Sequence, residues 1–174
     1  DVDSMAAWGF NCVRVAMHYK WFTPPIEEEP VQGEITWIDK GFEMIDSLLD
    51  WCGANEMYLV LDLHGAPGGQ GKNADISDYD PSKPSLWESE LNKEKTVALW
   101  RKLAERYANE KWIGGYDLIN EVNWTFPEGN NSQLRDLYGR ITDAIREVDQ
   151  NHIIFIEGNW FANDFSGLTP PWDD

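Results

Sequence analysis

Basic residues are scarce in this sequence of 174 residues: 14 Lys and Arg stand against 31 Asp and Glu, which gives a formal charge of −17 at neutral pH. Binding to nucleic acids or to anionic membrane surfaces depends on clustered Lys and Arg, so the deficit argues against both partners. No apolar run approaches the roughly 20 residues that a membrane span needs. Residues 1–5 (DVDSM) also lack the charged and apolar regions of a signal peptide. We expect a soluble chain, with any targeting segment absent or already removed.

Cysteine is also sparse. Cys12 and Cys52 are the two copies in the chain, whereas a disulfide scaffold or an all-cysteine zinc site needs four or more. A single bridge between them stays open, although two buried thiols are the commoner arrangement. Tryptophan, in contrast, is abundant, with ten copies. Flat apolar rings stack on sugars as well as filling cores, so the composition suggests a carbohydrate ligand without establishing it.

Four short runs rich in β-branched and aromatic residues predict four strands, at residues 12–17 (CVRVAM), 57–63 (MYLVLDL), 116–120 (YDLIN) and 152–156 (HIIFI). An amphipathic stripe at helical spacing lies in each of the three intervals, over residues 38–49, 97–107 and 134–148. Apolar strands that alternate with amphipathic helices indicate a parallel sheet covered by helices. The fold class is therefore α/β.

Two architectures share this alternation, the doubly wound sheet and the eight-stranded (β/α)8 TIM barrel. The first strand continues into His18 and Tyr19 rather than into a glycine-rich phosphate-binding turn, which favours the barrel. Long loops follow the strands and place the functional surface at their carboxyl ends. A whole barrel needs about 250 residues, and four strand units are visible here. We predict that residues 1–174 form the N-terminal half of one barrel domain.

Polar residues stand where the predicted strands end. Arg14 lies within the first strand, His64 follows the second, Asn120 and Glu121 follow the third, and Glu157 follows the fourth. In a barrel these positions converge on one mouth. A carboxyl group beside an amide and apolar strand residues is suited to general acid catalysis, which the cleavage of a glycosidic bond requires.

Three stretches carry a specific resemblance: residues 9–15 (GFNCVRV), 61–69 (LDLHGAPGG) and 118–122 (LINEV). They resemble the second, third and fourth strands of family 5 glycoside hydrolases, the cellulase and glucanase group with a (β/α)8 barrel. The resemblance extends over essentially the whole chain. It implies a secreted enzyme, extracellular or periplasmic, whose partner is a β-glucan or a related polysaccharide or oligosaccharide.

By this resemblance, Glu121 matches the family's catalytic acid/base and Asn120 the amide that holds the sugar 2-hydroxyl. His64 matches the histidine after strand three, and Arg14 the strand-two arginine near the nucleophile. The family usually has Asn-Glu-Pro where this chain has Val122. That difference affects the turn rather than a reacting group.

The resemblance places the nucleophile on strand seven, and we expect it beyond Asp174. Glu157 follows the strand next to that of Glu121, so we interpret it as a residue that binds substrate or supports its neighbours. Further candidates for substrate binding are Trp124 and Trp160 as stacking platforms, with His18 and Tyr19 lining the cleft. For both tryptophans a place in the core is an equal alternative.

The resemblance thus implies a retaining β-glycosidase of endo- or exo-β-glucanase type with no metal or organic cofactor. Two other functions stay open. A barrel that binds glycan without cleaving it would show affinity but no hydrolysis. A metal-dependent barrel hydrolase would use His18, His64 and nearby carboxylates, although the sequence lacks the close His pair from which such sites usually start.

Overall fold

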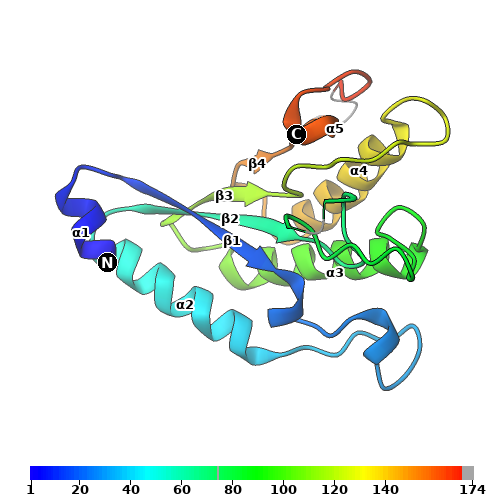
Figure 1. Cartoon of the computed structure of the whole chain (residues 1–174). Helices are drawn as coiled ribbons and strands as arrows, with labels where there is room; N and C mark the ends of the chain where they lie inside the picture. The colour runs from blue at the N-terminus through cyan, green and yellow to red at the C-terminus, as the bar shows by residue number, and fades with distance from the viewer. Residues whose placement is uncertain (74, 170–174) are drawn as a thin grey trace.

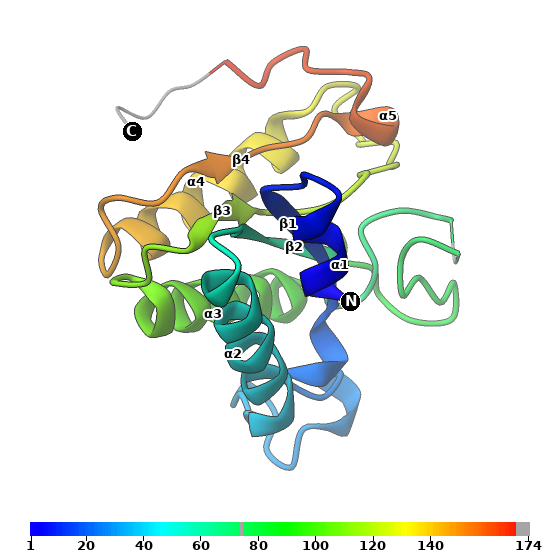
Figure 2. The ribbon, with the colours of Figure 1, turned by 90° about the vertical axis from the view of Figure 1, so that its left-hand side faces the viewer.

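The computed structural model describes residues 1–73 and 75–169, and its centre is one parallel sheet of four strands in the order β1-β2-β3-β4 (Figure 1). The strands are β1 (Cys12–His18), β2 (Tyr58–Gly65), β3 (Ile113–Asp117) and β4 (Ile154–Phe155). Helices α2 (Asp39–Ala54), α3 (Glu90–Tyr107) and α4 (Ser132–Arg146) connect them and lie along one side of the sheet (Figure 2). This sheet of sequential parallel strands is part of a (β/α)8 barrel, and the predicted fold class is confirmed.

The helices form where the apolar stripes predict them. Their buried faces pack against the sheet, with Phe42, Ile45 and Leu49 from α2, Leu99, Trp100 and Leu103 from α3, and Leu137, Tyr138 and Ile141 from α4. Helix α3 begins at an N-cap, Ser89, whose hydroxyl accepts a hydrogen bond from the backbone N–H of Asn92. Shorter helices are α1 (Val2–Ala7), α5 (Asn159–Ala162) and two 3₁₀ turns at Tyr19–Trp21 and Ile26–Glu28.

The strand register brings polar side chains together on the side of the sheet away from the helices. Ala16 pairs with Asp62, and Asp62 pairs in turn with Asp117. Side chains alternate along a strand, so Arg14 shares a face with Ala16. The β2–β3 register shifts by one residue between Leu59 and Val60. Gly115 lies at the shifted position and has no room for a side chain, since a Cβ there would lie 2.6 Å from the carbonyl oxygen of Ile153.

Two strand boundaries differ from the sequence prediction. Strand β3 ends at Asp117, although we expected a strand over residues 116–120. The apolar run continues because Leu118 and Ile119 are buried in the core after the strand has ended. Strand β4 has two residues instead of the expected five, and Ile153 before it is exposed.

A buried ion pair fixes the long connection between β1 and α2. Lys95, in α3, is buried and forms an ion pair with Glu29. Its Nζ also donates to Thr23 Oγ1 at 3.0 Å and to the carbonyl oxygen of Pro24 at 2.7 Å. These contacts satisfy every donor of the ammonium group, as a buried charge requires. The loop after β1 is therefore anchored to α3.

The two cysteines are unbridged, with Cys12 exposed and Cys52 buried. Burial raises the pKa of both thiols. Among the described residues, no helix combines the length and the apolar character that crossing a membrane would require.

Candidate active site

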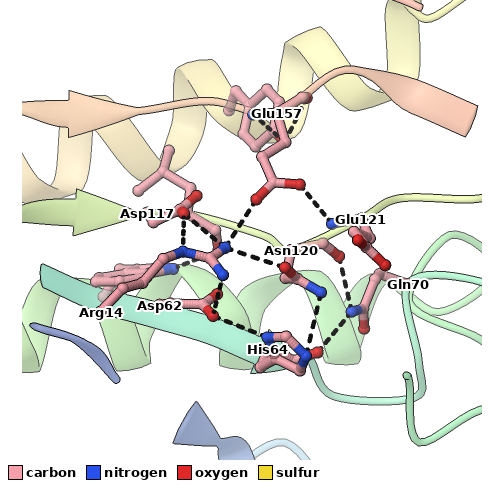
Figure 3. Close-up of polar contacts among 11 residues, drawn as sticks. Arg14, Asp62, His64, Gln70, Asp117, Asn120, Glu121 and Glu157 are labelled. Carbon is pink, nitrogen blue, oxygen red and sulfur yellow. Dashed lines mark hydrogen bonds and ion pairs between the residues drawn. The ribbon is translucent and has the colours of Figure 1, made fainter. Parts of the chain in front are cut away.

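Arg14 lies at the centre of the polar cluster, and its guanidinium contacts acidic side chains from three neighbouring strand units (Figure 3). Its Nη1 is 3.0 Å from Asp62 Oδ2 on β2, and its Nε donates to Asp117 Oδ2 on β3 at 2.8 Å. After β4, Glu157 Oε1 accepts from Nη2 at 2.8 Å. The same Nη2 donates to Asn120 Oδ1 at 3.0 Å. One positive charge therefore organises three carboxyl groups and the amide.

The three carboxyl groups are crowded and poorly solvated. Burial raises the pKa of Asp62, Asp117 and Glu157, although the charge of Arg14 acts in the opposite direction. Asp62 Oδ1 and Asp117 Oδ1 are buried without a hydrogen-bond partner among residues 1–73 and 75–169. Burial alone would lower the pKa of Arg14. The hydrogen bond to Asp117 and the charges of the nearby carboxylates outweigh burial, so the pKa of Arg14 is raised. The cluster therefore depends on Arg14 for its charge balance.

His64 is oriented by the same cluster. Its Nδ1 lies 2.8 Å from Asp62 Oδ2, so the carboxylate places a proton on Nδ1 and leaves Nε2 to face the open side of the sheet. Nε2 is 3.5 Å from Asn120 Nδ2. The side chains of His64 and Asn120 consequently lie side by side, with their polar atoms on one surface.

Glu121 follows directly, in an unusual backbone conformation with a φ of 43°. Left-handed conformations cost a residue other than glycine about 1–3 kcal/mol and persist where surrounding contacts impose them. The N–H of Glu121 donates to Glu157 Oε2 at 2.7 Å, and Gln70 Nε2 donates to the carbonyl oxygen of Asn120 at 2.9 Å. No group among the described residues binds the half-buried carboxyl group of Glu121 itself. It is thus available to exchange a proton with a ligand.

The structure brings five of the predicted site residues into one cluster: Arg14, His64, Asn120, Glu121 and Glu157 (Figure 3). His18 and Tyr19 lie outside it, at the end of β1. Tyr19 is 2% exposed and its hydroxyl donates to Asp78 at 2.9 Å, and His18 stacks on its ring at 5.1 Å. Burial lowers the pKa of His18 and raises that of Tyr19. These contacts support a packing role for Tyr19.

The two candidate stacking tryptophans differ in accessibility. Trp124 is 7% exposed, and its ring packs against Tyr79 at 5.7 Å and lies under Lys72 at 5.1 Å, which favours the core alternative for this residue. Trp160 is 45% exposed and borders a cavity of about 320 Å³. Trp160, Phe161 and Ala162 are three consecutive residues with positive φ angles, between 52° and 60°. Trp160 is therefore accessible at this cavity, beyond the carboxyl end of β4.

Four residues of the site were missed by the sequence analysis: Asp62, Asp117, Gln70 and Tyr138. A signal existed for the first two, because a carboxylate within an apolar strand needs a cation and Arg14 lies within the same sheet, one strand from Asp62 and two from Asp117. Gln70 lies in a loop without periodicity and gave none. Among the described residues, no three or more His, Cys, Asp or Glu side chains gather in a way that would hold a metal ion.

Comparison with known proteins identifies the family. The model of the cellulase family, glycosyl hydrolase family 5, matches residues 1–174. The chain belongs to glycosyl hydrolase family 5. This family 5 chain is 34% identical over 167 residues to a beta-xylosidase of Phanerodontia chrysosporium, covering 95% of the chain and 33% of that protein. It is 33% identical over 159 residues to endoglucanase C of Acetivibrio thermocellus, covering 91% of the chain and 41% of that protein.

A solved structure supports the same assignment. The family 5 chain superposes on the crystal structure of a glycoside hydrolase with a TM-score of 0.75 and 29% identity, covering 94% of the chain and 47% of the solved one. The chain thus spans between a third and a half of the length of these relatives. Both the resemblance inferred from the strand motifs and the partial barrel are confirmed by these matches.

Proposed function

We propose that this chain is the part of a retaining β-glycosidase that carries the acid/base, Glu121, and that the enzyme hydrolyses O-glycosidic bonds in β-glucan-type polysaccharides or oligosaccharides. The observation that carries the proposal is the unpartnered carboxyl group of Glu121, which stands beside Asn120 and His64 at the carboxyl end of the sheet. Membership of glycosyl hydrolase family 5 supports the reaction class.

The proposed reaction has two steps. In the first, a carboxylate from outside this chain attacks the anomeric carbon, while the Glu121 carboxyl group gives its proton to the departing glycosidic oxygen. The carbon–oxygen bond to the leaving sugar breaks and a covalent glycosyl-enzyme forms. In the second, Glu121 takes a proton from water, whose oxygen attacks the same carbon and releases the sugar with retained configuration.

The neighbours of Glu121 have roles that follow from their contacts. Asn120 Oδ1 is occupied by Arg14, so its Nδ2 is the atom that faces a ligand and can donate to a sugar hydroxyl. With its Nδ1 held by Asp62, His64 accepts one hydrogen of Asn120 Nδ2 at its Nε2, at 3.5 Å, and thereby orients the amide, whose other hydrogen is left for the sugar. Neither role needs a metal ion or an organic cofactor.

The names of the relatives limit the substrate class. One relative is named a beta-xylosidase and another an endoglucanase, so the shared feature is a β-linked sugar. We propose β-glucan, for which exposed Trp160 offers a stacking surface at the cleft. A polymeric substrate lies outside the cell, and we therefore propose a secreted enzyme.

The stereochemistry of the product tests this reaction. A full-length enzyme that contains this chain, supplied with a β-linked cello-oligosaccharide, should release the β-anomer first. Proton NMR of the anomeric signals in the first minutes of hydrolysis will measure it, because mutarotation is slower. Initial release of the α-anomer would show inversion and would exclude the covalent intermediate. Binding without any hydrolysis would instead favour a glycan-binding barrel.

A further inference from the structure

The peptide bond between Asn120 and Glu121 is held at both ends by side chains from distant parts of the chain (Figure 3). Gln70 Nε2 donates to its carbonyl oxygen at 2.9 Å, and Glu157 Oε2 accepts from its N–H at 2.7 Å. The tilt of this peptide plane sets the φ angle of Glu121. It therefore also sets the direction in which the Glu121 side chain leaves the backbone.

These hydrogen bonds are needed because the backbone conformation of Glu121 is unfavourable for a residue other than glycine. Glu121 has a φ of 43°, a region in which the Cβ of an L residue is crowded against its own backbone. The carbonyl oxygen of Val122, the residue after Glu121, also accepts a hydrogen bond, from the N–H of Phe161 at 3.0 Å. Without these contacts, the turn would relax toward a commoner conformation and redirect the carboxyl group.

Gln70 is itself immobilised. It is fully buried, and its Oε1 accepts from the N–H of Ala66 at 3.1 Å. Its Nε2 also donates to the carbonyl oxygen of His64 at 2.8 Å. Both donor hydrogens of the amide are therefore used, one on the His64 carbonyl at the end of β2 and one on the peptide before Glu121. The orientation of the amide is fixed by these partners.

Glu157 is held just as firmly on the other side. Its Oε1 accepts from Arg14 Nη2 at 2.8 Å. The hydroxyl of Tyr138, buried in α4, donates to the Glu157 carbonyl oxygen at 2.9 Å and accepts from its N–H at 3.3 Å. Both carboxylate oxygens thus face donors of the protein. This occupancy argues for a supporting role, in preference to direct contact with a sugar.

We propose that Gln70 and Glu157 are positioning residues that together clamp the peptide bond before Glu121 and aim its carboxyl group at the scissile oxygen. The proposal rests on the proposed function, since it requires Glu121 to be the acid/base. It assigns a role in catalysis to a loop residue, Gln70. It also gives Glu157 the role of orienting Glu121 in place of binding the substrate.

Two isosteric substitutions test the clamp in a full-length enzyme that contains this chain. E157Q replaces one acceptor oxygen with an NH₂ group. Either Arg14 Nη2 or the N–H of Glu121 would then face another donor. Q70E replaces the NH₂ that bridges two carbonyl oxygens with an oxygen. Misplacement of a catalytic group by about 1 Å costs roughly a hundredfold in rate. We expect each variant to lower kcat/KM at least about tenfold on glycosides with poor leaving groups, with little loss of kcat/KM on dinitrophenyl glycosides, because this ratio reports the first step and their departure in that step needs no proton.

Double variants separate positioning from a general structural role. Once Glu121 has been replaced by Gln, adding E157Q or Q70E should lower kcat/KM no further, because residues that act through Glu121 lose their effect with it. Asp149→Asn is the matched control. Asp149 is buried, and its carboxylate accepts from the hydroxyl of Tyr116 at 2.7 Å and contacts Asn151 and His152, none of which belongs to the cluster around Glu121. That isosteric change should lower Tm without any dependence on the leaving group.

Equal losses of kcat/KM on both classes of substrate, or full additivity with E121Q, would overturn the clamp while leaving Glu121 as the acid/base. If E121Q itself shows no dependence on the leaving group, the proposed function fails instead. Should one of the two clamp variants not fold, the other gives the same comparison.

Discussion

Glu121→Gln should lower kcat/KM, which reports the glycosylation step, by about 10²- to 10⁴-fold on β-glycosides with poor leaving groups, the range that general acid catalysis contributes. An alkoxide of high pKa must receive a proton as it departs, and a carboxamide cannot supply one. Dinitrophenyl glycosides carry leaving groups that depart without protonation, so their glycosylation step should be affected far less. Steady-state kinetics on both classes of substrate, in a full-length enzyme that contains this chain, measure the difference.

The leaving-group comparison has an internal control. Asp75→Asn changes a carboxylate in the long loop after β2 that has no contact with Glu121, and it should leave the ratio of the two rates at its wild-type value. Equal losses of kcat/KM on both substrates with E121Q would remove Glu121 from the acid role. The unpartnered carboxyl group would then be better explained as a sugar ligand.

Arg14→Met should lower the free energy of unfolding by about 2 kcal/mol at pH 8. Breaking a buried ion pair costs about 3–5 kcal/mol, and we reduce that figure because the Arg14 side chain is 40% exposed. Asp62, Asp117 and Glu157 would remain close together without a counter-charge. Burial already raises the pKa of all three, and loss of Arg14 should raise these values further.

The sign of the pH dependence follows from proton uptake. Between the ordinary carboxyl pKa and the raised folded value, the folded variant binds more protons than the unfolded chain, so its stability falls as pH rises. The deficit relative to wild type should therefore be largest at pH 8 and should shrink toward pH 5. Denaturant unfolding at both pH values measures it.

Arg106→Met is the matched control for Arg14→Met. Arg106 forms an ion pair with Asp46 on the helical surface, and its hydrogen bond is the main cause that lowers the pKa of Asp46. That contribution is present above the ordinary pKa of Asp and is lost only as pH falls below it. Its deficit should thus be equal at pH 5 and pH 8. A deficit for Arg14→Met that was also constant, or that grew on acidification, would contradict the charge balance described for the cluster.

Helix positions and strand order were predictable because burial imposes a period on the sequence. Phe42, Ile45 and Leu49 face the sheet as their spacing requires. The end of β3 was not predictable, because the apolar residues Leu118 and Ile119 continue the pattern of the strand after it has ended. They are apolar because they are buried in the core. Apolar composition reports burial rather than backbone conformation, and the two separate where a chain turns inside a core.

The candidate site was predictable to the extent that strand ends of a barrel converge. Arg14, His64 and Asn120 meet for that reason. The support around them was not visible, since Gln70 acts on a backbone 50 residues away through contacts that only the folded loop creates. Aromatic side chains gave the weakest signal. Trp124 and Trp160 both follow strand ends, yet one is packed between neighbours and the other is exposed.

Azide rescue of a Glu121→Ala variant tests the central claim most directly. In a full-length enzyme that contains this chain, a dinitrophenyl β-glycoside can still form the glycosyl-enzyme, but no base then activates water for the second step. Azide needs no base and should restore turnover, with a β-glycosyl azide as the product identified by NMR. No acceleration by azide, or formation of the α-glycosyl azide, would contradict the assignment of Glu121 as the acid/base.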